Sequence, residues 1–175
     1  MLAKMTVAEA AQAVSEAPEK TRLELVAPFV EAAARVLMQE CSETIQKGNL
    51  FRVRSPQTTN DVSALIAITG GVAGLVIYSM SLETARHIAS RMMGGEEVPE
   101  FDPMAQSAVA ELANMITGQA GIGLEKSGFP NDMSPPVLLV GHGSSIATFN
   151  LTRLVVPLIV STGEFNIDIA IKEAA

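Results

Sequence analysis

Two long apolar runs joined by a pair of glycines constrain the fold of this 175-residue chain more than any other feature. The runs are "VSALIAIT" and "VAGLVIYSM", both rich in β-branched residues, and Gly70-Gly71 between them suits a tight turn. We therefore predict a β-hairpin. The C-terminal stretch "EFNIDIAIK" predicts another strand, because every second residue is a large apolar one and these would share one face. The residues on that face are Phe165, Ile167, Ile169 and Ile171.

The first helix is predicted over residues 28–47. Apolar residues recur there at helical spacing, Pro28 suits the first helical position, and Gly48 stands where a glycine ends many helices. Residues 1–26 are predicted to form an N-terminal extension without a strong apolar stripe, extended at 24–26 just before that proline. Residues 27–175 would then make up a single domain.

Two further helices and several strands complete the expected order. Ser81 caps a short helix that ends at Gly94-Gly95, and Asp102 with Pro103 begins a long helix that runs to about Ser127. Strands are also predicted in "LFRVRS", in "VLLVG", and over 144–162 as two strands or one bent strand, with a hairpin turn at Thr162-Gly163 before the last strand. The order α-βββ-αα-βββ predicts an α+β fold, a mainly antiparallel sheet with helices packed on one face.

Composition argues against several classes of function. The net charge is −7 and the 12 Lys and Arg residues are scattered, so we expect no nucleic-acid partner. The single cysteine, Cys41, permits no disulfide within the chain and is expected to be buried as a small hydrophobe. We find neither an uncharged apolar run of membrane-spanning length nor a clear secretory signal, and expect a soluble, cytoplasmic protein with no membrane contact.

Motifs for other kinds of chemistry are weak. His87 and His142 lie far apart with no Cys or acidic cluster, so no metal site and no cofactor of the chain's own are expected. The glycines of 118–123 fall inside a predicted helix, whereas a phosphate-binding loop needs a strand before it and a helix after it. We expect these small residues to serve close packing, or room for a partner. Ser144-Ser145 lacks the pattern of a hydrolase nucleophile.

The long helix carries the best candidate site. At 100° per residue, one side holds Ala105, Val109, Leu112 and Ile116, whereas Ser107, Glu111, Asn114 and Gly118 form an opposed stripe. Side chains three apart on a helix stand about 5–6 Å apart at Cβ, so Glu111 and Asn114 can enter one pocket of a partner together. A single Glu-x-x-Asn pair is close to what chance produces in such a chain, and a solvated helix face remains the plain alternative. Asn is, however, a poor choice for the interior of a merely solvated helix.

The stripe resembles the motif of the CheC/CheX/FliY phosphatases of bacterial chemotaxis. In that motif Asp or Ser is followed by Glu, Asn and a more distant Pro, here Ser107, Glu111, Asn114 and Pro136. "VAPFVEAAARVL", "GGVAGLVIYSMSLETARHIASRMMG" and "GFPNDMSPPVLLVG" are similar to CheX in particular, in the same order. The resemblance covers residues 26–171. CheC proteins carry two copies of the motif, whereas this chain has one Glu-x-x-Asn. Glu43 and Gln46 have a similar spacing and are expected to be ordinary helix surface.

This resemblance implies a phosphatase that acts on the aspartyl phosphate of a CheY-type response regulator, with Mg²⁺ held by that substrate. Asn114 would position the attacking water and Glu111 would contact a lysine of the regulator. Ser107, Gly118 and Pro136 would contact the partner without taking part in the chemistry. The resemblance also implies a homodimer, for which strand edges such as "FRVRS" or "TRLVVPLIV" are candidates. The alternatives are a regulator-binding or flagellar-switch-like module without catalysis, and a sensory accessory domain with a small-ligand site.

Overall fold

The computed structural model describes residues 23–53, 57–58, 60–148 and 151–174. Three helices and ten strands lie in these residues. In chain order they are α2 (Leu23–Glu40), β1 (Gln46–Lys47), β2 (Phe51–Val53), β3 (Gln57–Thr58), β4 (Val62–Gly70), β5 (Val72–Met80), α3 (Leu82–Met92), α4 (Pro103–Lys126), β6 (Asn131–Met133), β7 (Val137–Val140), β8 (Ser145–Ile146), β9 (Arg153–Val160) and β10 (Gly163–Glu173).

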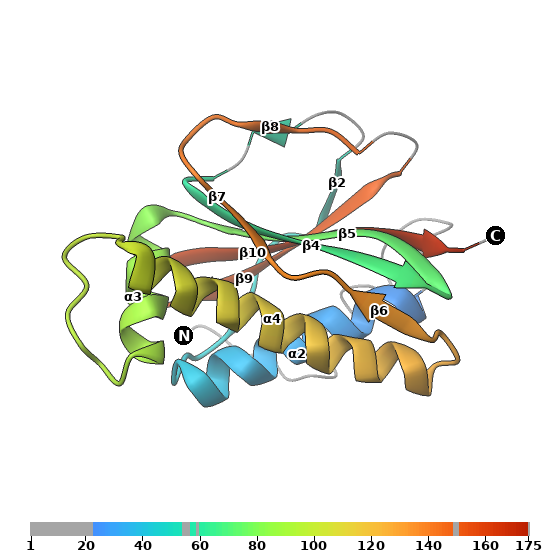
Figure 1. Ribbon diagram of the computed structural model, residues 1–175, viewed down its shortest axis with the longest axis horizontal. Coiled ribbons are helices and arrows are strands. Elements are labelled where there is room, and N and C mark those ends of the chain that lie inside the picture. Colours follow the sequence, from blue (N-terminus) through green and yellow to red (C-terminus); the bar gives the residue numbers. More distant parts are fainter. Residues whose placement is uncertain (1–22, 54–56, 59, 149–150, 175) are drawn as a thin grey trace.

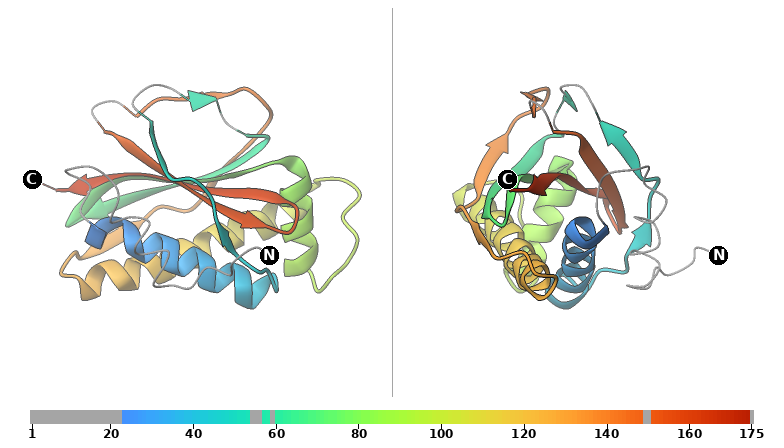
Figure 2. Two further views of the ribbon diagram at one scale, coloured as in Figure 1. Left: turned by 180° about the vertical axis from the view of Figure 1, so that it is seen from behind. Right: turned by 90° about the vertical axis from the view of Figure 1, so that its right-hand side faces the viewer.

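The architecture is one curled antiparallel sheet with all three helices on the same face (Figures 1 and 2). The sheet has eight strands in the order β1-β9-β10-β5-β4-β6, with β2 also paired to β9 and β7 also paired to β4. Strands β3 and β8 form a separate two-stranded sheet, which lies over the face away from the helices (Figure 2). The predicted α+β fold with helices on one face is confirmed.

The hydrophobic core lies between the sheet and the helices. Phe165, Ile167, Ile169 and Ile171 of β10 are all buried, as the alternating pattern predicts. The Tyr78 ring of β5 packs at 5.9 Å from the Phe165 ring, and the Tyr78 hydroxyl hydrogen bonds with Thr117 Oγ1 of α4 at 2.8 Å. This bond satisfies a polar group inside the core and ties α4 to the middle of the sheet.

The central hairpin and the two later helices agree with the prediction. Strands β4 and β5 pair across the turn at Gly70-Gly71, where Gly70 has a φ of 108°. The Ser81 hydroxyl accepts a hydrogen bond from the Thr84 N–H at 3.1 Å at the start of α3. The Asp102 carboxylate accepts from the Ala105 N–H at 2.9 Å at the start of α4. Each cap satisfies an N–H that has no partner within its helix.

The first helix differs from the prediction at both ends. Helix α2 begins at Leu23, so residues 23–26, assigned to the extension and expected to be extended at 24–26, are helical, and Pro28 lies inside the helix. It ends at Glu40 rather than at 47, because Ser42 takes a φ of 55°, which breaks the helical path. Cys41 is buried as expected, although it lies just beyond the helix.

Three details of the sheet also differ from the prediction. The stretch 131–133, predicted as a loop, pairs with the end of β4 as β6. The turn before the last strand is one residue earlier than predicted, because Gly163 already pairs with Val160. Strand β9, taken as a possible free edge, is flanked by β10 on one side and by β1 and β2 on the other. Part of "FRVRS" and residues 1–22 lie outside the described residues.

Candidate functional site

Helix α4 carries the predicted stripe on its outer side. Its inner residues Val109, Leu112 and Ile116 are buried against the sheet, as their spacing requires. The opposite side holds Glu111 and Ser107, both exposed, and the half-buried Asn114 and Gly118. The buried and accessible sides of α4 thus fall where the periodicity predicts them.

Glu111 and Asn114 are free to meet a partner. Among the residues that the structure describes, no hydrogen bond or ion pair engages either side chain. They are three residues apart on one continuous helix, so both heads project from the same side. Ser107 differs, because its hydroxyl donates to the Pro103 carbonyl at 2.9 Å within the first turn.

Strand β6 runs beside α4 next to the stripe. A Cβ added at Gly118 would lie 3.5 Å from the Met133 Cε atom, and one at Gly121 would lie 2.8 Å from the Asn131 side-chain oxygen. The Asn131 amide donates to the Gly121 carbonyl at 2.9 Å, which fastens strand to helix. The glycines of 118–123 therefore lie within a helix and serve close packing, as expected from the sequence, and they do not form a phosphate-binding loop.

Pro136 is half-buried in the short segment between β6 and β7. Both strands contact α4, so the segment that joins them runs alongside this helix (Figure 1). The fold thus brings the more distant proline of the motif to the neighbourhood of α4, although the two are separated along the chain by a turn and a strand.

Residues 62–159 match the family described as chemotaxis phosphatase CheX. The chain belongs to this family. The matched range contains the hairpin, α3 and the whole of α4 with its stripe. The resemblance that the motif indicated is therefore confirmed, and with it the predicted phosphatase class of activity.

Similar proteins carry the same family name. The CheY-P phosphatase CheX of Thermotoga maritima is 37% identical over 108 residues, which are 62% of this chain and 70% of that protein. The crystal structure of chemotaxis protein CheX from Vibrio vulnificus is 27% identical with a TM-score of 0.77, covering 85% of this chain and 99% of that one. The CheX–CheY–BeF₃–Mg²⁺ complex from Borrelia burgdorferi is 29% identical with a TM-score of 0.73, covering 85% and 98%.

A second polar cluster joins α3 to the turn between β9 and β10, and sequence reasoning missed it. Glu43, expected on a helix surface, is buried beyond the end of α2. Its carboxylate accepts hydrogen bonds from the Ser161 N–H and hydroxyl, both at 2.9 Å, and lies 2.6 Å from His87 Nε2. Burial raises the pKa of Glu43, but the bonds from Ser161 and His87 outweigh it and hold the pKa below its ordinary value.

The same cluster does not have the geometry of a serine hydrolase. In a catalytic triad the acid bonds one ring nitrogen of the histidine and the serine bonds the other. Here Glu43 and Ser161 both face His87 Nε2, at 2.6 and 3.3 Å, and the Ser161 hydroxyl donates to Glu43. The serine proton is therefore directed to a carboxylate and not to an imidazole. We assign the cluster a structural role that fastens three segments together.

Within the described ranges, no group of three or more His, Cys, Asp or Glu residues is placed to hold a metal ion. His142 instead pairs with Asp61, with 3.0 Å between the ring nitrogen and the carboxylate. None of the described helices is both long and apolar enough to cross a membrane. The expectation that the chain needs no cofactor of its own stays a prediction.

Proposed function

We propose that the chain accelerates hydrolysis of the aspartyl phosphate on a CheY-type response regulator by inserting Asn114 and Glu111 into the regulator's active site. The observation that carries this proposal is the pair itself, accessible and without partners on α4 of a chain of the CheX family. Two relatives support the choice of substrate. One is named a CheY-P phosphatase, and the other is a CheX seen in complex with CheY, BeF₃ and Mg²⁺.

Asn114 is the proposed positioning residue for the attacking water. Phosphoryl transfer passes through a loose transition state, so catalysis depends on placement and charge stabilisation more than on a strong base. A side-chain amide can accept a hydrogen bond from water without adding negative charge beside the phosphoryl group. Held on a rigid helix, Asn114 would fix the water in line with the phosphorus atom and so reduce the entropic part of the barrier.

Glu111 is the proposed docking residue. Its carboxylate is exposed and carries no cation partner among the described residues, so it is available for a lysine ammonium of the regulator. A charge-assisted hydrogen bond of this kind fixes the register of the two proteins. Mg²⁺ belongs to the substrate in this proposal, and water attacks the phosphorus directly without a covalent intermediate on this chain.

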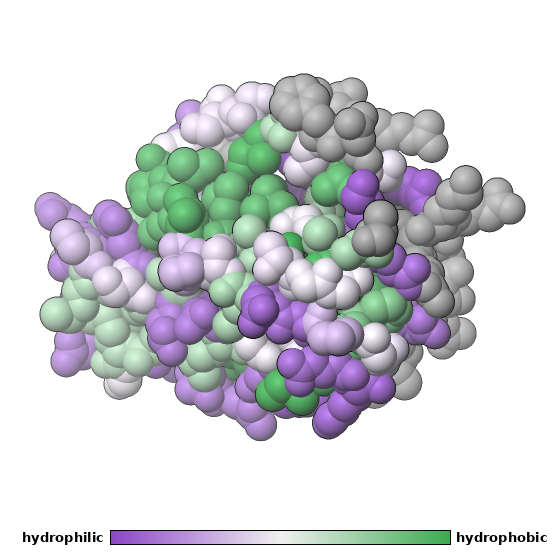
Figure 3. Space-filling view, turned by 45° about the vertical axis from the view of Figure 1, so that its right-hand side comes forward, coloured by the Kyte–Doolittle hydropathy of each residue, from purple (hydrophilic) through white to green (hydrophobic). Residues whose placement is uncertain are grey.

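The ends of the same helix face offer apolar anchors. Met104 and Ile122 are 66% and 55% exposed, and each is rotated by about 20° from Glu111 around the helix axis. They lie about 27 Å apart along α4, with the stripe between them. Ser107, Gly118 and Pro136 are proposed to contact the partner within this span. Hydrophobic side chains also gather on the neighbouring surface that β7 crosses (Figure 3), which suits contact with a second copy of the chain.

Catalysis is tested by following the decay of a phosphorylated CheY-type regulator with this chain present at about one-tenth of the regulator's concentration. A catalyst turns over repeatedly, so we expect all of the phosphate to be lost faster than by the regulator alone. A Gln39→Ala variant changes an exposed amide on α2 and should act like the parent. Unchanged decay together with measurable binding would favour the non-catalytic, switch-like module instead.

We also propose that the chain forms a homodimer and works in the cytoplasm, where phosphorylated regulators occur. Of the two strands suggested from sequence as edges, β9 is interior, and β2 is described over Phe51–Val53, where it pairs with β9. Strand β7 is a better candidate, since among the described strands it pairs only with β4, and its end residues Val137 and Val140 are exposed.

A further inference from the structure

The sheet face opposite the helices carries a row of polar residues across three neighbouring strands. Asn166 of β10 is paired with Ser79 of β5, and Ser79 is paired with Ser63 of β4. Directly paired residues point to the same side of a sheet, and neighbouring strands lie about 4.8 Å apart. The flanking residues Phe165 and Tyr78 point into the core. The polar row therefore points away from the helices.

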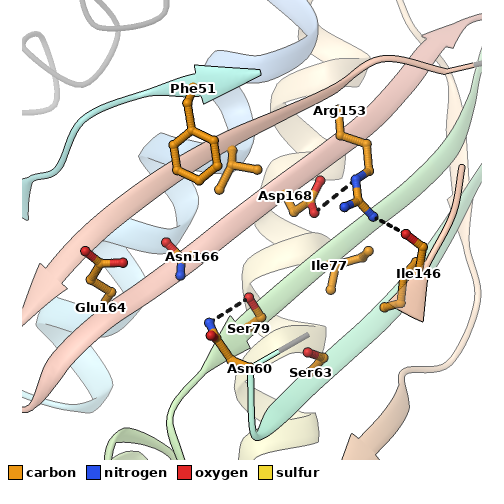
Figure 4. A pocket seen from close by; sticks show the side chains of 11 residues that line it. Phe51, Asn60, Ser63, Ile77, Ser79, Ile146, Arg153, Glu164, Asn166 and Asp168 are labelled. Atoms are coloured by element: carbon orange, nitrogen blue, oxygen red, sulfur yellow. Dashed lines mark hydrogen bonds and ion pairs between the residues drawn. The ribbon is translucent and has the colours of Figure 1, made fainter. Parts of the chain in front are cut away.

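An ion pair continues this polar row. Asp168 lies two residues beyond Asn166 on β10 and so shares its face. The Asp168 carboxylate lies 3.4 Å from Arg153 Nε, and Arg153 Nη1 donates to the Ile146 carbonyl of β8 at 3.1 Å. Both charged side chains are buried, and Figure 4 shows the pair beside the polar row. A buried pair of opposite charges leaves this end of the row close to neutral.

The row and the ion pair line a cavity of about 180 Å³. Figure 4 shows polar side chains from β4, β5, β9 and β10 around it, with apolar side chains between them. The apolar part of the lining comes from Phe51, Ile77, Ile146 and Val155. This space is smaller than the pockets of drug-sized ligands, but it accommodates one compact organic molecule or several waters.

Three buried polar atoms of the lining have no hydrogen-bond partner among the described residues. They are Ser63 Oγ, Asn166 Oδ1 and Asp168 Oδ1. Buried polar atoms are nearly always bonded, because an unsatisfied one destabilises the folded state. Ser79 differs, since its hydroxyl accepts from the Asn60 amide at 3.3 Å. Three unsatisfied atoms on one cavity wall need hydrogen-bond partners, which either ordered water or a bound molecule can supply.

We propose that this cavity binds a small uncharged polyol whose hydroxyl groups bond to Ser63, Asn166 and Asp168. The site lies on the face of the sheet away from α4, so its occupation is separate from the proposed phosphatase function.

The chemistry of the lining selects this class of ligand. An amide oxygen and a carboxylate oxygen only accept, whereas a serine hydroxyl takes either role, so the ligand must bring at least two donors. Burial raises the pKa of Asp168 to about 6, against the lowering influence of Arg153, so at neutral pH its carboxylate is ionised and Oδ1 accepts. An anion would bring its negative charge beside the Glu164 and Asp168 carboxylates. A cation would meet one charge of each sign in the Arg153–Asp168 pair and so would gain no net attraction from it. Hydroxyl groups supply donors without an unpaired charge.

The test is ligand-observed NMR and thermal unfolding of the full chain with chosen probes. Erythritol, ribose and glucose serve as polyols of increasing size, and ethanolamine and glycolate serve as charged analogues. We expect saturable binding of at least one polyol with a Kd below about 10 mM, and weaker binding of both charged analogues.

Two variants locate the site. Asn166→Ala and Ser63→Ala each remove one proposed bond and should weaken polyol binding about fivefold or more, because one hydrogen bond to a ligand contributes roughly that factor. Gln39→Ala lies on α2 and should bind like the parent. If Asn166→Ala fails to fold, Ser63→Ala alone shows whether the polyol binds in this cavity, since deleting a single hydroxyl leaves the fold intact.

Several results would overturn the proposal. No saturable signal from any polyol would mean that ordered water satisfies the three atoms. Equal polyol affinity in the parent and in folded Ser63→Ala would place binding elsewhere, and tighter binding of ethanolamine or glycolate would refute the class of ligand.

Discussion

At the scale of single residues, Glu43 shows what local pattern cannot predict. Its sequence neighbours continue the spacing of a helix face, and that spacing predicted a surface residue. The structure buries it against Ser161, a residue 118 positions later, and against His87. No short motif signals such a contact, because its members come from three elements that only the folded sheet brings together. By contrast, Glu111 and Asn114 lie on one helix, so their shared face followed from helical spacing alone.

The Glu43 cluster makes stability depend on pH. The pKa of Glu43 is lowered in the folded state, so the stabilisation is fully present above the ordinary value of 4.5 and is lost as the pH falls through the folded value. Glu43→Gln should lower the free energy of unfolding by about 1–3 kcal/mol at pH 7, and the difference from the parent should shrink below about pH 4. Urea unfolding at both pH values measures this. Glu83→Gln, at an exposed site on α3, is the control, and an equal effect at both pH values would contradict the assignment.

At the scale of elements, capping residues predicted where two helices begin, whereas apolar spacing did not predict where α2 ends. Helices α3 and α4 begin where Ser81 and Asp102 predict, because a cap is a local interaction between neighbouring residues. The end of α2 was predicted too late because Cys41 and Ile45 continue its apolar spacing. Both side chains are buried, but the segment that carries them lies beyond the helix and is not helical. Burial can thus produce an apparent helical period without a helix.

The edge of β7 is where we expect two copies of the chain to pair. A strand edge without a partner offers its backbone groups to a second strand, and a lysine at such an edge opposes pairing. The parent chain should therefore have twice the 18.4 kDa mass of one chain by light scattering at micromolar concentration, and Val137→Lys should be monomeric. Met104→Lys places the same charge at an exposed methionine of α4 and should stay dimeric. A monomeric parent, or a dimeric Val137→Lys variant, would exclude this edge.

At the scale of the whole molecule, the order of elements predicted the fold class, but the sheet pairing could not be derived. Runs of strands beside runs of helices favour an antiparallel sheet covered by helices on one face, and the chain forms one. The interior position of β9 and the addition of β6 depend on pairing between segments far apart in sequence. The cavity on the sheet face away from the helices could not be predicted either, because it forms where strand pairing brings Asn166, Ser79 and Ser63 into one row.

In the proposed reaction Asn114 places the attacking water, whereas Glu111 docks the chain on the regulator. The most direct test compares Asn114→Ala and Glu111→Lys with the parent, measuring both binding to a beryllofluoride-loaded CheY-type regulator and the rate of phosphate loss. We predict that Asn114→Ala keeps its affinity within about threefold but loses at least about a hundredfold in the rate, because placement of the nucleophile is removed. Glu111→Lys should lose both binding and rate, because it sets a like charge against the regulator's lysine. Parental turnover by folded Asn114→Ala would contradict the account.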